Sequence, residues 1–535
     1  MPYNNDDLNI DKNFPMPEYR PLQKEVIKEA LGHYNNGMVN VVLQAPTGYG
    51  KSIPAITMAR IMGSAYYLTI QKVLQTALDD KFGQWLSVLK GRNAYPCLTM
   101  IDKMGGKNVN ADNGLCMRKG KGSLPECSDI CQYQLAVERA QKTNISVFNF
   151  YNFLFQRAYA KRFEGPRELI IIDEAHQLES QIMSFVEFTI RPTEFGEPVP
   201  KCESVEEYCS LLENKKVIQK LEDELENNKK ELQQLPPEDD RCVKLAKDID
   251  HLKSVLHKYS AFVSALNKGV EFVAEYSDEK SSVTFKPIYA SYHAPLILSG
   301  GQHRLLMSAT ILNLNVYSNS LGLDKAKSVF IEIPHPFPVE NRLIHLECVG
   351  SMKAANKKET MPKMVEKVRE LMEKHSNQRG IIHCQSFYLM REIIKSLPSK
   401  QAGRLTHQDK YNNKDDLLHA HSKKKDSVLI GPALHEGIDL IDDLSRFQII
   451  IKVPYPDFTN NKQMQIRMKR DWSWYLWLTA CKLIQSIGRS CRSSTDWCST
   501  YICDSDIFGF LSNCTKCGLL PKWFVDAIRV NGEPI

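Results

Sequence analysis

One short segment of the chain carries the residue types that hold a phosphate chain. It consists of Thr47, Gly48, Tyr49, Gly50, Lys51 and Ser52, within APTGYGKS. In such a loop the glycines let backbone N–H groups point at phosphates, the lysine reaches the β and γ phosphates, and the serine hydroxyl binds Mg²⁺. Ala45 stands where the strict pattern has its first glycine. Because the segment lies between an apolar strand and an amphipathic helix, it predicts a loop that binds ATP together with Mg²⁺.

An acidic pair follows another apolar strand further along the chain. Asp173 and Glu174 open the sequence DEAH directly after LIII. Asp173 can bind the water shell of Mg²⁺ while Glu174 polarises an attacking water, as phosphoryl transfer requires. A lone DEAH has little weight. It gains weight here because it lies downstream of the phosphate loop at a strand end.

A basic segment near the carboxyl terminus could serve the same reaction. In QSIGRSCR, Gln485, Arg489 and Arg492 are four and three positions apart, so a helix would carry them on one face. Such arginines could neutralise the charge that develops on a γ-phosphate across a cleft. A solvated basic helix face is the alternative interpretation. The tripeptide Ser308-Ala309-Thr310 is a further feature that counts only in combination with the others.

The elements that must position these residues form two α/β runs. Apolar strands in VNVVLQ, ELIII and LLMSATI, and then in GIIHCQSF, SVLIGPAL, FQIIIKVPYP and STYICDSD, predict parallel sheets flanked by helices. Residues 96–132 are rich in Gly, Lys, Asn and Cys without a clean period, which predicts an insertion out of the first sheet. Residues 180–292 show helical patterning, broken by a turn at Pro236-Pro237.

A chain of 535 residues is too long for a single core, so several domains are expected. The predicted division assigns 1–95, 133–185 and 285–333 to a first α/β domain, 96–132 to the cysteine-containing insertion, 186–284 to the helical insertion and 334–535 to a second α/β domain.

The cysteines of the first insertion form the most specific metal-binding pattern. Cys97, Cys116, Cys127 and Cys131 are the only cysteines in the first 200 residues. Four thiolates match the ligand set of a 4Fe-4S cluster, and they also match a tetrahedral zinc site. Near the end of the chain, Cys514 and Cys517 form an isolated CxxC, preceded by Cys498 and Cys503. For that group, packing is favoured over a second metal site because no clear second pair accompanies it.

The overall composition says more about the cellular location of the protein than about its function. The net charge of +6 and the pI near 8.4 permit a polyanionic partner without identifying one. The amino terminus lacks a signal-peptide pattern and no apolar run is long enough to span a bilayer. We therefore expect a cytoplasmic, nucleoid or nuclear protein, neither secreted nor bound to a membrane, in which the cysteines are not a disulfide framework.

Taken in order, these motifs resemble the XPD/DinG family of superfamily-two helicases, over about residues 17 to 510. Further segments support the resemblance: YRPLQ, LTIQKVLQ, the pair Asn149-Phe150, IIHCQSF and HEGIDL. The resemblance implies two RecA-like motor domains, the first carrying an iron-sulfur insertion and a helical arch insertion. It also implies ATP-driven translocation on single-stranded DNA, 5′ to 3′, and unwinding of forked DNA by a monomeric motor.

The resemblance also assigns roles to individual residues. It implies ATP contacts, in addition to the phosphate loop, at Arg20, Gln23, Glu436, Gly437 and Asp439. It implies DNA contacts at Thr69, Lys72, Gln75, Asn149 and Ser386. It favours a 4Fe-4S cluster over zinc on Cys97, Cys116, Cys127 and Cys131, although the three residues between Cys127 and Cys131 depart from the commoner CxxC.

Two other functional classes compete with this interpretation. One is a nucleotide-switched binding module that regulates partners without unwinding, against which Lys51, Glu174 and Arg489 argue. The other is an RNA-directed DEAH helicase with a zinc site, which the four cysteines and the place of the helical insertion oppose. In DWSWYLWLT, Trp472, Trp474 and Trp477 could stack on bases, but packing within a helix is the favoured prediction.

Overall fold

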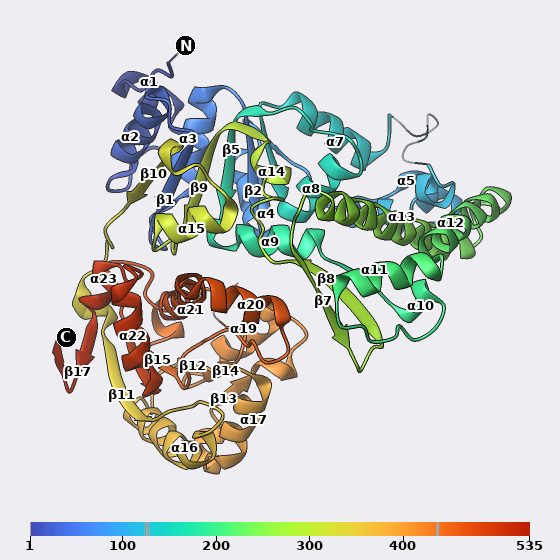
Figure 1. The fold of residues 1–535 in the computed structure, drawn as a ribbon. Coiled ribbons are helices and arrows are strands. Elements are labelled where there is room, and N and C mark those ends of the chain that lie inside the picture. Colours follow the sequence, from blue (N-terminus) through green and yellow to red (C-terminus); the bar gives the residue numbers. More distant parts are fainter. Residues whose placement is uncertain (1, 122–123, 125–126, 128, 435–437, 535) are drawn as a thin grey trace.

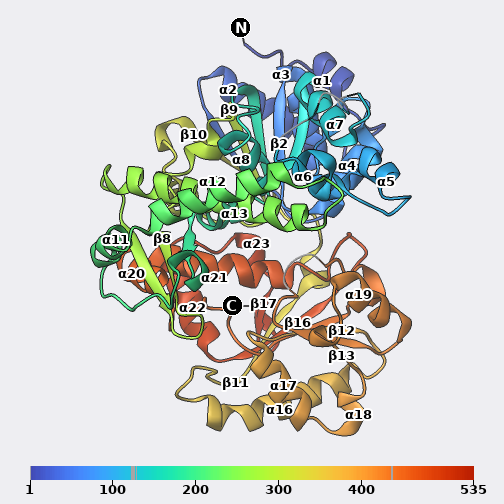
Figure 2. The same ribbon diagram turned by 90° about the vertical axis from the view of Figure 1, so that its right-hand side faces the viewer.

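The computed structural model describes residues 2–121, 124, 127, 129–434 and 438–534. Two parallel sheets, each flanked by helices, form the body of the molecule, one above the other in Figure 1. A pair of long helices extends away from the upper part. In Figure 2 this pair faces the viewer and crosses the first α/β domain.

The first sheet brings three distant segments to one edge. Within the described residues its strand order is β10-β1-β9-β5-β2-β4-β3, and all neighbours run parallel. The strands are β1 (Asn40–Gln44), β2 (Ala65–Thr69), β3 (Leu86–Val88), β4 (Ile145–Asn149), β5 (Arg167–Asp173), β9 (Gly301–Ser308) and β10 (Ser328–Glu332). Gln44 pairs with Ser308, and Asp173 pairs with Met307. The loops after β1, β5 and β9 therefore leave the sheet side by side, where ligands bind in such sheets.

The second sheet repeats the arrangement with other strands. Its order in the described residues is β13-β14-β12-β15-β16-β11-β17-β18, parallel except for the last pair. The strands are β11 (Ile344–Gly350), β12 (Gly380–His383), β13 (Leu405–His407), β14 (Val428–Gly431), β15 (Phe447–Ile450), β16 (Ser499–Asp504), β17 (Ile528–Val530) and β18 (Glu533–Pro534). The chain crosses from the first sheet to the second between β10 and β11.

Helices cover both faces of each sheet, which confirms the predicted α/β class. Those of the first are α1 (Asp7–Asn13), α2 (Gln23–Asn35), α3 (Ser52–Met62), α4 (Lys72–Phe82), α7 (Gln132–Lys142), α8 (Phe150–Ala158), α9 (Leu178–Val186), α14 (Pro295–Leu298) and α15 (Leu314–Leu321). Those of the second are α16 (Lys357–Lys374), α17 (Phe387–Ser396), α18 (Ser399–Ala402), α19 (Lys414–Lys423), α20 (Lys462–Arg470), α21 (Trp472–Ile487), α22 (Asp506–Lys516) and α23 (Lys522–Val525).

The predicted cysteine-containing insertion lies between β3 and α7. In the described residues it contains the α-helices α5 (Leu98–Lys103) and α6 (Leu115–Arg118), with the 3-10 helix Ala111–Asn113 between them. A small apolar cluster that includes Met100, Val109 and Leu115 holds them together. Arg118 is buried and donates to the carbonyl of Pro237 at 2.9 Å, so this segment contacts the turn of the helical pair.

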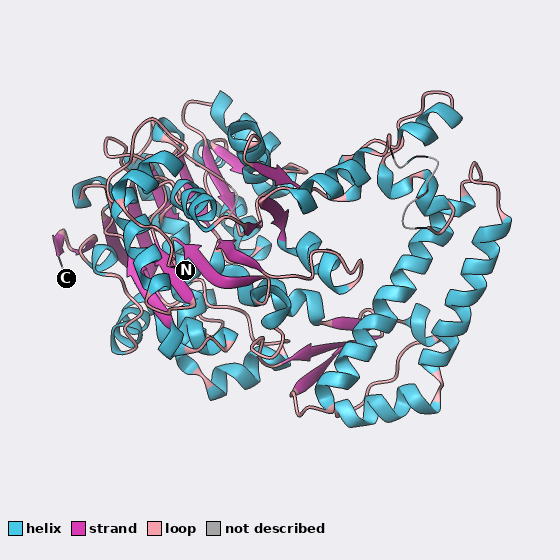
Figure 3. Ribbon diagram, turned by 90° about the horizontal axis from the view of Figure 1, so that it is seen from above, coloured by secondary structure: helices cyan, strands magenta, loops and turns pink. Residues whose placement is uncertain are grey.

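The helical insertion contains α10 (Pro192–Phe195), α11 (Val205–Asn214), α12 (Val217–Gln234) and α13 (Arg241–Leu266). The helices α12 and α13 pack side by side along their length, as Figure 3 shows. Leucines of α12 at positions 221, 225 and 232 are buried against apolar residues of α13, which are spaced three to four apart as helix packing requires.

The prediction of helix throughout residues 180–292 is wrong at the base of this insertion. There, β6 (Phe188–Ile190), β7 (Phe272–Ser277) and β8 (Ser282–Pro287) form an antiparallel sheet in the order β6-β8-β7. Apolar and polar residues alternate along SVTFKP, whose burial alternates along part of the strand, so the period of two outweighs the flanking helical pattern. Strand β8 continues to Pro287, beyond the predicted boundary at 284.

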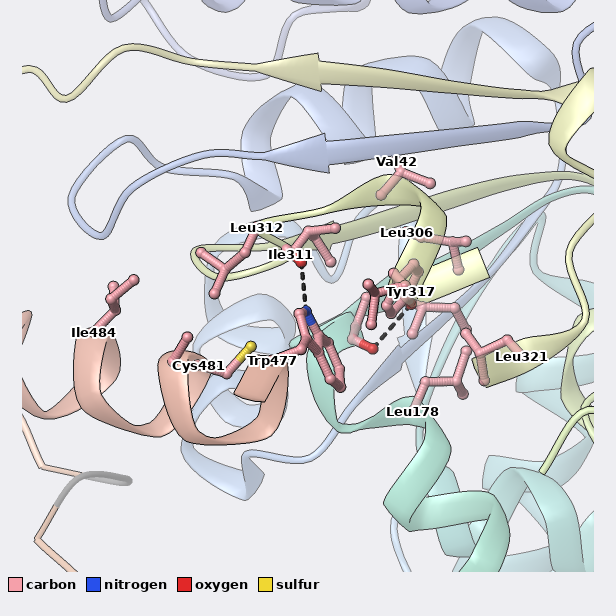
Figure 4. Packing of buried hydrophobic residues seen from close by; sticks show 14 of the residues in the cluster. Val42, Leu178, Leu306, Ile311, Leu312, Tyr317, Leu321, Trp477, Cys481 and Ile484 are labelled. Atoms are coloured by element: carbon pink, nitrogen blue, oxygen red, sulfur yellow. Dashed lines mark hydrogen bonds between the residues drawn. The ribbon is translucent and has the colours of Figure 1, made fainter. Parts of the chain in front are cut away.

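The two α/β domains share a continuous apolar core. Trp477 of α21 is buried and its indole N–H donates to the carbonyl of Ile311, just after β9, at 2.7 Å. Figure 4 shows this contact, with Cys481 and Ile484 of the same helix pointing toward the first domain. Packing therefore explains Trp477 and Trp474, which are both buried, whereas Trp472 is 46% exposed. None of the helices in the described parts of the chain is long and apolar enough to cross a membrane.

Candidate active site

The phosphate loop lies where the sequence places it, between β1 and α3. Gly48 and Gly50 have φ angles of +86° and +81°, which L side chains rarely adopt. A Cβ at Gly48 would also lie 3.0 Å from the ring of Phe337 and 3.1 Å from the carbonyl oxygen of Arg492. The Nζ of Lys51 donates to the carbonyl of Ala45 at 3.2 Å. Glycine is thus required where the second domain approaches the loop.

Arg20 and Gln23 brace the phosphate loop from outside. The side-chain amide of Gln23 donates to the carbonyl of Tyr49 at 3.0 Å, and the guanidinium of Arg20 donates to the carbonyl of Gly48. The amide oxygen of Gln23 accepts the backbone N–H of Arg20 at 3.0 Å. Both residues lie at the site, and their contact with an adenine stays a prediction.

The acidic pair stands at the end of β5, opposite the phosphate loop. Burial raises the pKa of Asp173 to about 7, the charge of Glu174 adds to the rise, and the charge of Lys51 opposes it. Glu174 has a φ of +53°, which turns the chain sharply away from the strand. Tyr67 donates its hydroxyl to Ser52 Oγ at 3.3 Å. A serine hydroxyl and a buried carboxylate facing one cavity are a donor set that suits Mg²⁺.

A chain of hydrogen bonds joins the two domains beside this pair. The side-chain amide of Gln485 donates to Nε2 of His176 at 2.6 Å and to Oγ1 of Thr310 at 3.0 Å. Because Nε2 accepts, Nδ1 carries the proton and donates to Oγ of Ser308 at 2.8 Å. Sequence reasoning assigned a role to Gln485 but none to His176 or Thr310. The sequence did contain a signal for both residues, because His176 is the last residue of DEAH and Thr310 is the last residue of the Ser308-Ala309-Thr310 tripeptide.

Arg489 and Arg492 do not share a helix face with Gln485, so that prediction is wrong. Helix α21 ends at Ile487, with Gly488 at its C-cap, and both arginines lie in the loop that follows. The guanidinium of Arg489 donates to the carbonyl of Ile438 at 3.1 Å. The guanidinium of Arg492 forms an ion pair with Asp439, whose side chain is 64% exposed. Tertiary contacts, and not helical periodicity, bring these arginines to the site.

A cavity of about 710 Å³ collects these side chains between the two domains. Its lining from the first domain includes Arg20, Thr47, Gly48, Gly50, Lys51, Ser52, Asp173, Glu174 and Thr310. Its lining from the second domain includes Asp439, Gln485, Gly488, Arg489 and Arg492. The cavity thus has phosphate-binding groups on one wall and cations on the other. Glu436 and Gly437 lie outside the described residues.

The predicted DNA contacts do not share one surface. The side chains of Thr69 and Gln75 are buried, and Lys72 lines the cavity of the phosphate loop. Asn149 accepts the backbone N–H of Asn152 at 2.7 Å and borders a second cavity of about 760 Å³. Ser386 accepts the backbone N–H of Leu389 at 3.2 Å and borders a cavity of about 860 Å³ in the second domain. Only Asn149 and Ser386 border cavities separate from the nucleotide cavity.

The four cysteines of the first insertion are gathered in one small region. Cys97, Cys116 and Cys127 belong to the apolar cluster of α5 and α6, and the backbone N–H of Cys131 donates to the carbonyl of Cys127 at 2.9 Å. Burial raises the pKa of Cys116. The donor chemistry fits an iron-sulfur cluster or zinc. Nevertheless, no three His, Cys, Asp or Glu side chains among the described residues are arranged closely enough to hold a metal ion.

The cysteines near the carboxyl terminus pack in the core. Cys498, Cys503 and Cys514 are buried, and burial raises the pKa of each thiol. Cys514 belongs to the core shared by both domains. This placement agrees with the packing prediction for these residues.

Comparisons of this chain with family models, with a curated protein and with solved structures all point to helicases. Residues 16–218 match the family model of the type III restriction enzyme res subunit, and residues 368–513 match that of a helicase C-terminal domain. A protein of Methanocaldococcus jannaschii, described as a probable ATP-dependent helicase, is 23% identical, with 91% of this chain and 92% of the relative covered. A solved XPD helicase covers 96% of this chain and 100% of its own, with a TM-score of 0.67 and 15% identity.

This chain is an ATP-dependent helicase with the fold of the XPD helicases. A second solved relative, Xpd4 of S. tokodaii, has a TM-score of 0.58 at 14% identity over 96% of this chain and 100% of its own. At such identities the structural matches establish the fold, so both sheets of this helicase belong to RecA-like domains. The expected fold class is confirmed, and the matches agree with the expected resemblance to XPD-like helicases.

Proposed function

We propose that this helicase moves along single-stranded DNA from 5′ to 3′ and unwinds forked duplexes, with a 4Fe-4S cluster held by Cys97, Cys116, Cys127 and Cys131. The observation that carries the motor part is the cavity between the domains. Its phosphate-binding wall and its cationic wall belong to different RecA-like domains. ATP can therefore join the domains, and hydrolysis can separate them.

The residues of the cavity divide the chemistry of hydrolysis among them. Ser52 and Asp173 would hold Mg²⁺, which when bound neutralises charge on the β and γ phosphates. Lys51 releases the carbonyl of Ala45 and binds the phosphate chain. Glu174 orients the attacking water and accepts its proton as a general base. Arg489 and Arg492 stabilise the charge that spreads over the γ-phosphate oxygens.

The second cavity supports a path for a single strand through the first domain. It lies between the cysteine-containing insertion, α8 and α13. Tyr151 and Phe155 of α8 line it and are 64% and 37% exposed. Arg92, Arg162 and Lys253 line the same cavity. Exposed aromatic rings beside cations suit single-stranded nucleic acid, because rings stack on bases and cations bind phosphates.

The cavity in the second domain supports a continuation of that path. The exposed Trp472 lies 5.4 Å from Tyr475, ring centroid to ring centroid, at an interplanar angle of 27°. Both rings line the cavity together with Lys357, Lys452 and Ser386. Trp472 is thus the tryptophan of DWSWYLWLT that can stack on a base.

Strand separation on matched forks tests the proposal. A fork with a 5′ single-stranded arm should be unwound in the presence of ATP and Mg²⁺, a 3′-armed fork should not, and Lys51→Ala should unwind neither. ATP turnover without strand separation on any fork would point to a nucleotide-switched binding module. Stronger stimulation and unwinding with RNA forks would point to an RNA-directed helicase.

The cluster is tested separately by metal analysis of anaerobically purified protein. Iron and a broad visible absorbance should be present in the wild type and lost in Cys116→Ser. Cys209→Ser, a change at a half-buried cysteine of the helical insertion, serves as the control and should keep both. Zinc in place of iron would overturn the iron-sulfur assignment and leave the motor intact.

A further inference from the structure

A charged contact between the two motor domains lies outside the nucleotide cavity. Glu179 of α9 and Arg467 of α20 are both buried and form an ion pair. The indole N–H of Trp474, in α21, donates to the other carboxylate oxygen of Glu179 at 2.8 Å. Two helices of the second domain therefore satisfy both oxygens of one carboxylate of the first.

The same arginine is held by aromatic faces. Its guanidinium carbon lies 3.8 Å from the ring centroid of Trp474 and 5.1 Å from that of Tyr289. A planar guanidinium can stack and pair at once, which a lysine ammonium cannot reproduce. Because the pair is desolvated, loss of either partner leaves a buried charge without compensation.

This contact and the active site lie on the same two helices or directly beside them. Helix α9 begins two residues after His176, and α21 carries both Trp474 and Gln485. These two residues of α21 are about 16 Å apart along the helix at 1.5 Å per residue. Each contacts the first domain, Gln485 at His176 and Trp474 at Glu179. Two anchors on one helix fix its orientation as well as its distance.

We propose that Glu179, Arg467 and Trp474 are positioning residues that orient α21, so that Arg489 and Arg492 beyond its end face the phosphate loop. None of the three lines the nucleotide cavity. The inference rests on the ATP-driven motor proposed above and adds to it the means by which the second wall of the cavity is placed.

Helix α20 also ties this network to the helical insertion. The backbone N–H of Gln463 donates to Glu275 at 3.1 Å, and its side-chain amide donates to the carbonyl of Pro287 at 2.7 Å. Arg470 forms an ion pair with Glu271 at 2.9 Å. A change in the orientation of α21 is thus passed through α20 to the sheet at the base of the insertion.

Steady-state kinetics with saturating single-stranded DNA test the proposal. Arg467→Lys should lower kcat about 10- to 100-fold with KM for ATP little changed, because misplacing a catalytic group affects the transition state more than ground-state binding. Glu179→Gln should lower kcat by a similar factor. The double variant should lower kcat no further than the more severe single variant, since both changes break the same contact.

A matched control separates positioning from general destabilisation. Arg404 is a buried arginine of the second domain that donates to the carbonyls of Met372 and His375, and its hydrogen bonds and its ion pair all join it to residues of the second domain. Arg404→Lys should lower Tm without lowering kcat. Equal loss of kcat in Arg404→Lys and Arg467→Lys, or wild-type kcat in both network variants, would overturn the proposal.

Tryptophan fluorescence gives a readout that needs nucleotide binding but no turnover. The emission of Trp474, obtained as the difference between wild type and Trp474→Phe, should change when a non-hydrolysable ATP analogue binds, and Glu179→Gln should abolish that change. An unchanged emission in wild type with bound analogue counts against the network. If wild type binds ATP without hydrolysing it, the proposed function fails, and this titration still decides on the network.

Discussion

The two walls of the nucleotide cavity are held in place by different means. On the first wall, Lys51 and Asp173 stand at element ends, where β1, β9 and β5 are neighbours in one sheet. On the second wall, Arg489 and Arg492 lie beyond the end of α21 and depend on Ile438, Asp439 and the packing of the helix.

This difference separates binding from hydrolysis. A wall built on strand ends is ordered whether or not the domains approach each other, so it can bind ATP alone. A wall made of a loop after a helix takes effect only when the second domain is correctly oriented. Changes to the phosphate-binding groups of the first wall should therefore affect nucleotide affinity and turnover, whereas changes on the second wall should affect turnover almost alone.

The largest effect is expected on the second wall. Arg489→Ala should lower kcat by roughly 10³-fold or more, as loss of an arginine finger does. The affinity for ATP, measured by equilibrium titration, should stay within a few-fold of wild type. Arg391→Ala, at an exposed arginine of the same domain, is the control and should leave both quantities unchanged. A large loss of ATP affinity in Arg489→Ala would contradict the inference that the second wall acts on turnover and not on binding.

Glu174→Gln on the first wall should lower kcat by roughly 10²- to 10⁴-fold, because the amide cannot act as a general base. ATP should still bind, since Lys51 and the loop amides are intact. Rapid-quench measurement of the hydrolysis step checks this. Wild-type turnover in this variant would remove Glu174 from the proposed chemistry.

A smaller effect is expected from Asp173 on stability. Its folded-state pKa is raised to about 7 by burial, above the value of an unfolded aspartate near 3.9, so folding favours the protonated form. Without Mg²⁺, stability should be highest below about pH 4 on this account and fall as pH rises toward 7. Asp173→Asn should flatten that dependence, as thermal unfolding at a series of pH values would show. An equally steep fall in stability with pH in the variant would mean that a group other than Asp173 causes the dependence.

The smallest effect is expected at Asp439. The side chain of Asp439 is 64% exposed although that of Arg492 is only 11% exposed, and an ion pair that is open to solvent on one side contributes little, about 0–1 kcal/mol. Asp439→Asn should therefore lower kcat by about fivefold or less, and the deficit should shrink at high salt. A loss as large as that of Arg489→Ala would mean that Asp439 contacts the nucleotide directly, as the sequence resemblance implied.

The sequence alone determined the first wall of this site. Glycines at positions 48 and 50, Lys51, Ser52 and the DEAH segment follow apolar strands, and parallel strands necessarily deliver their carboxyl ends to one edge. The order of motifs was also enough to indicate the XPD-like family. The base of the helical insertion was predicted less well, because a short alternating strand such as β8 is hard to see beside long helices.

Only the tertiary structure decided the second wall. Spacing placed Gln485, Arg489 and Arg492 on one helix face, but the helix ends at Ile487 and the arginines reach the cavity through a loop. The contacts of Gln485 with His176, and of Arg467 with Glu179, join residues about 300 positions apart. Local periodicity describes one element at a time, whereas such contacts depend on how two separately folded sheets pack against each other.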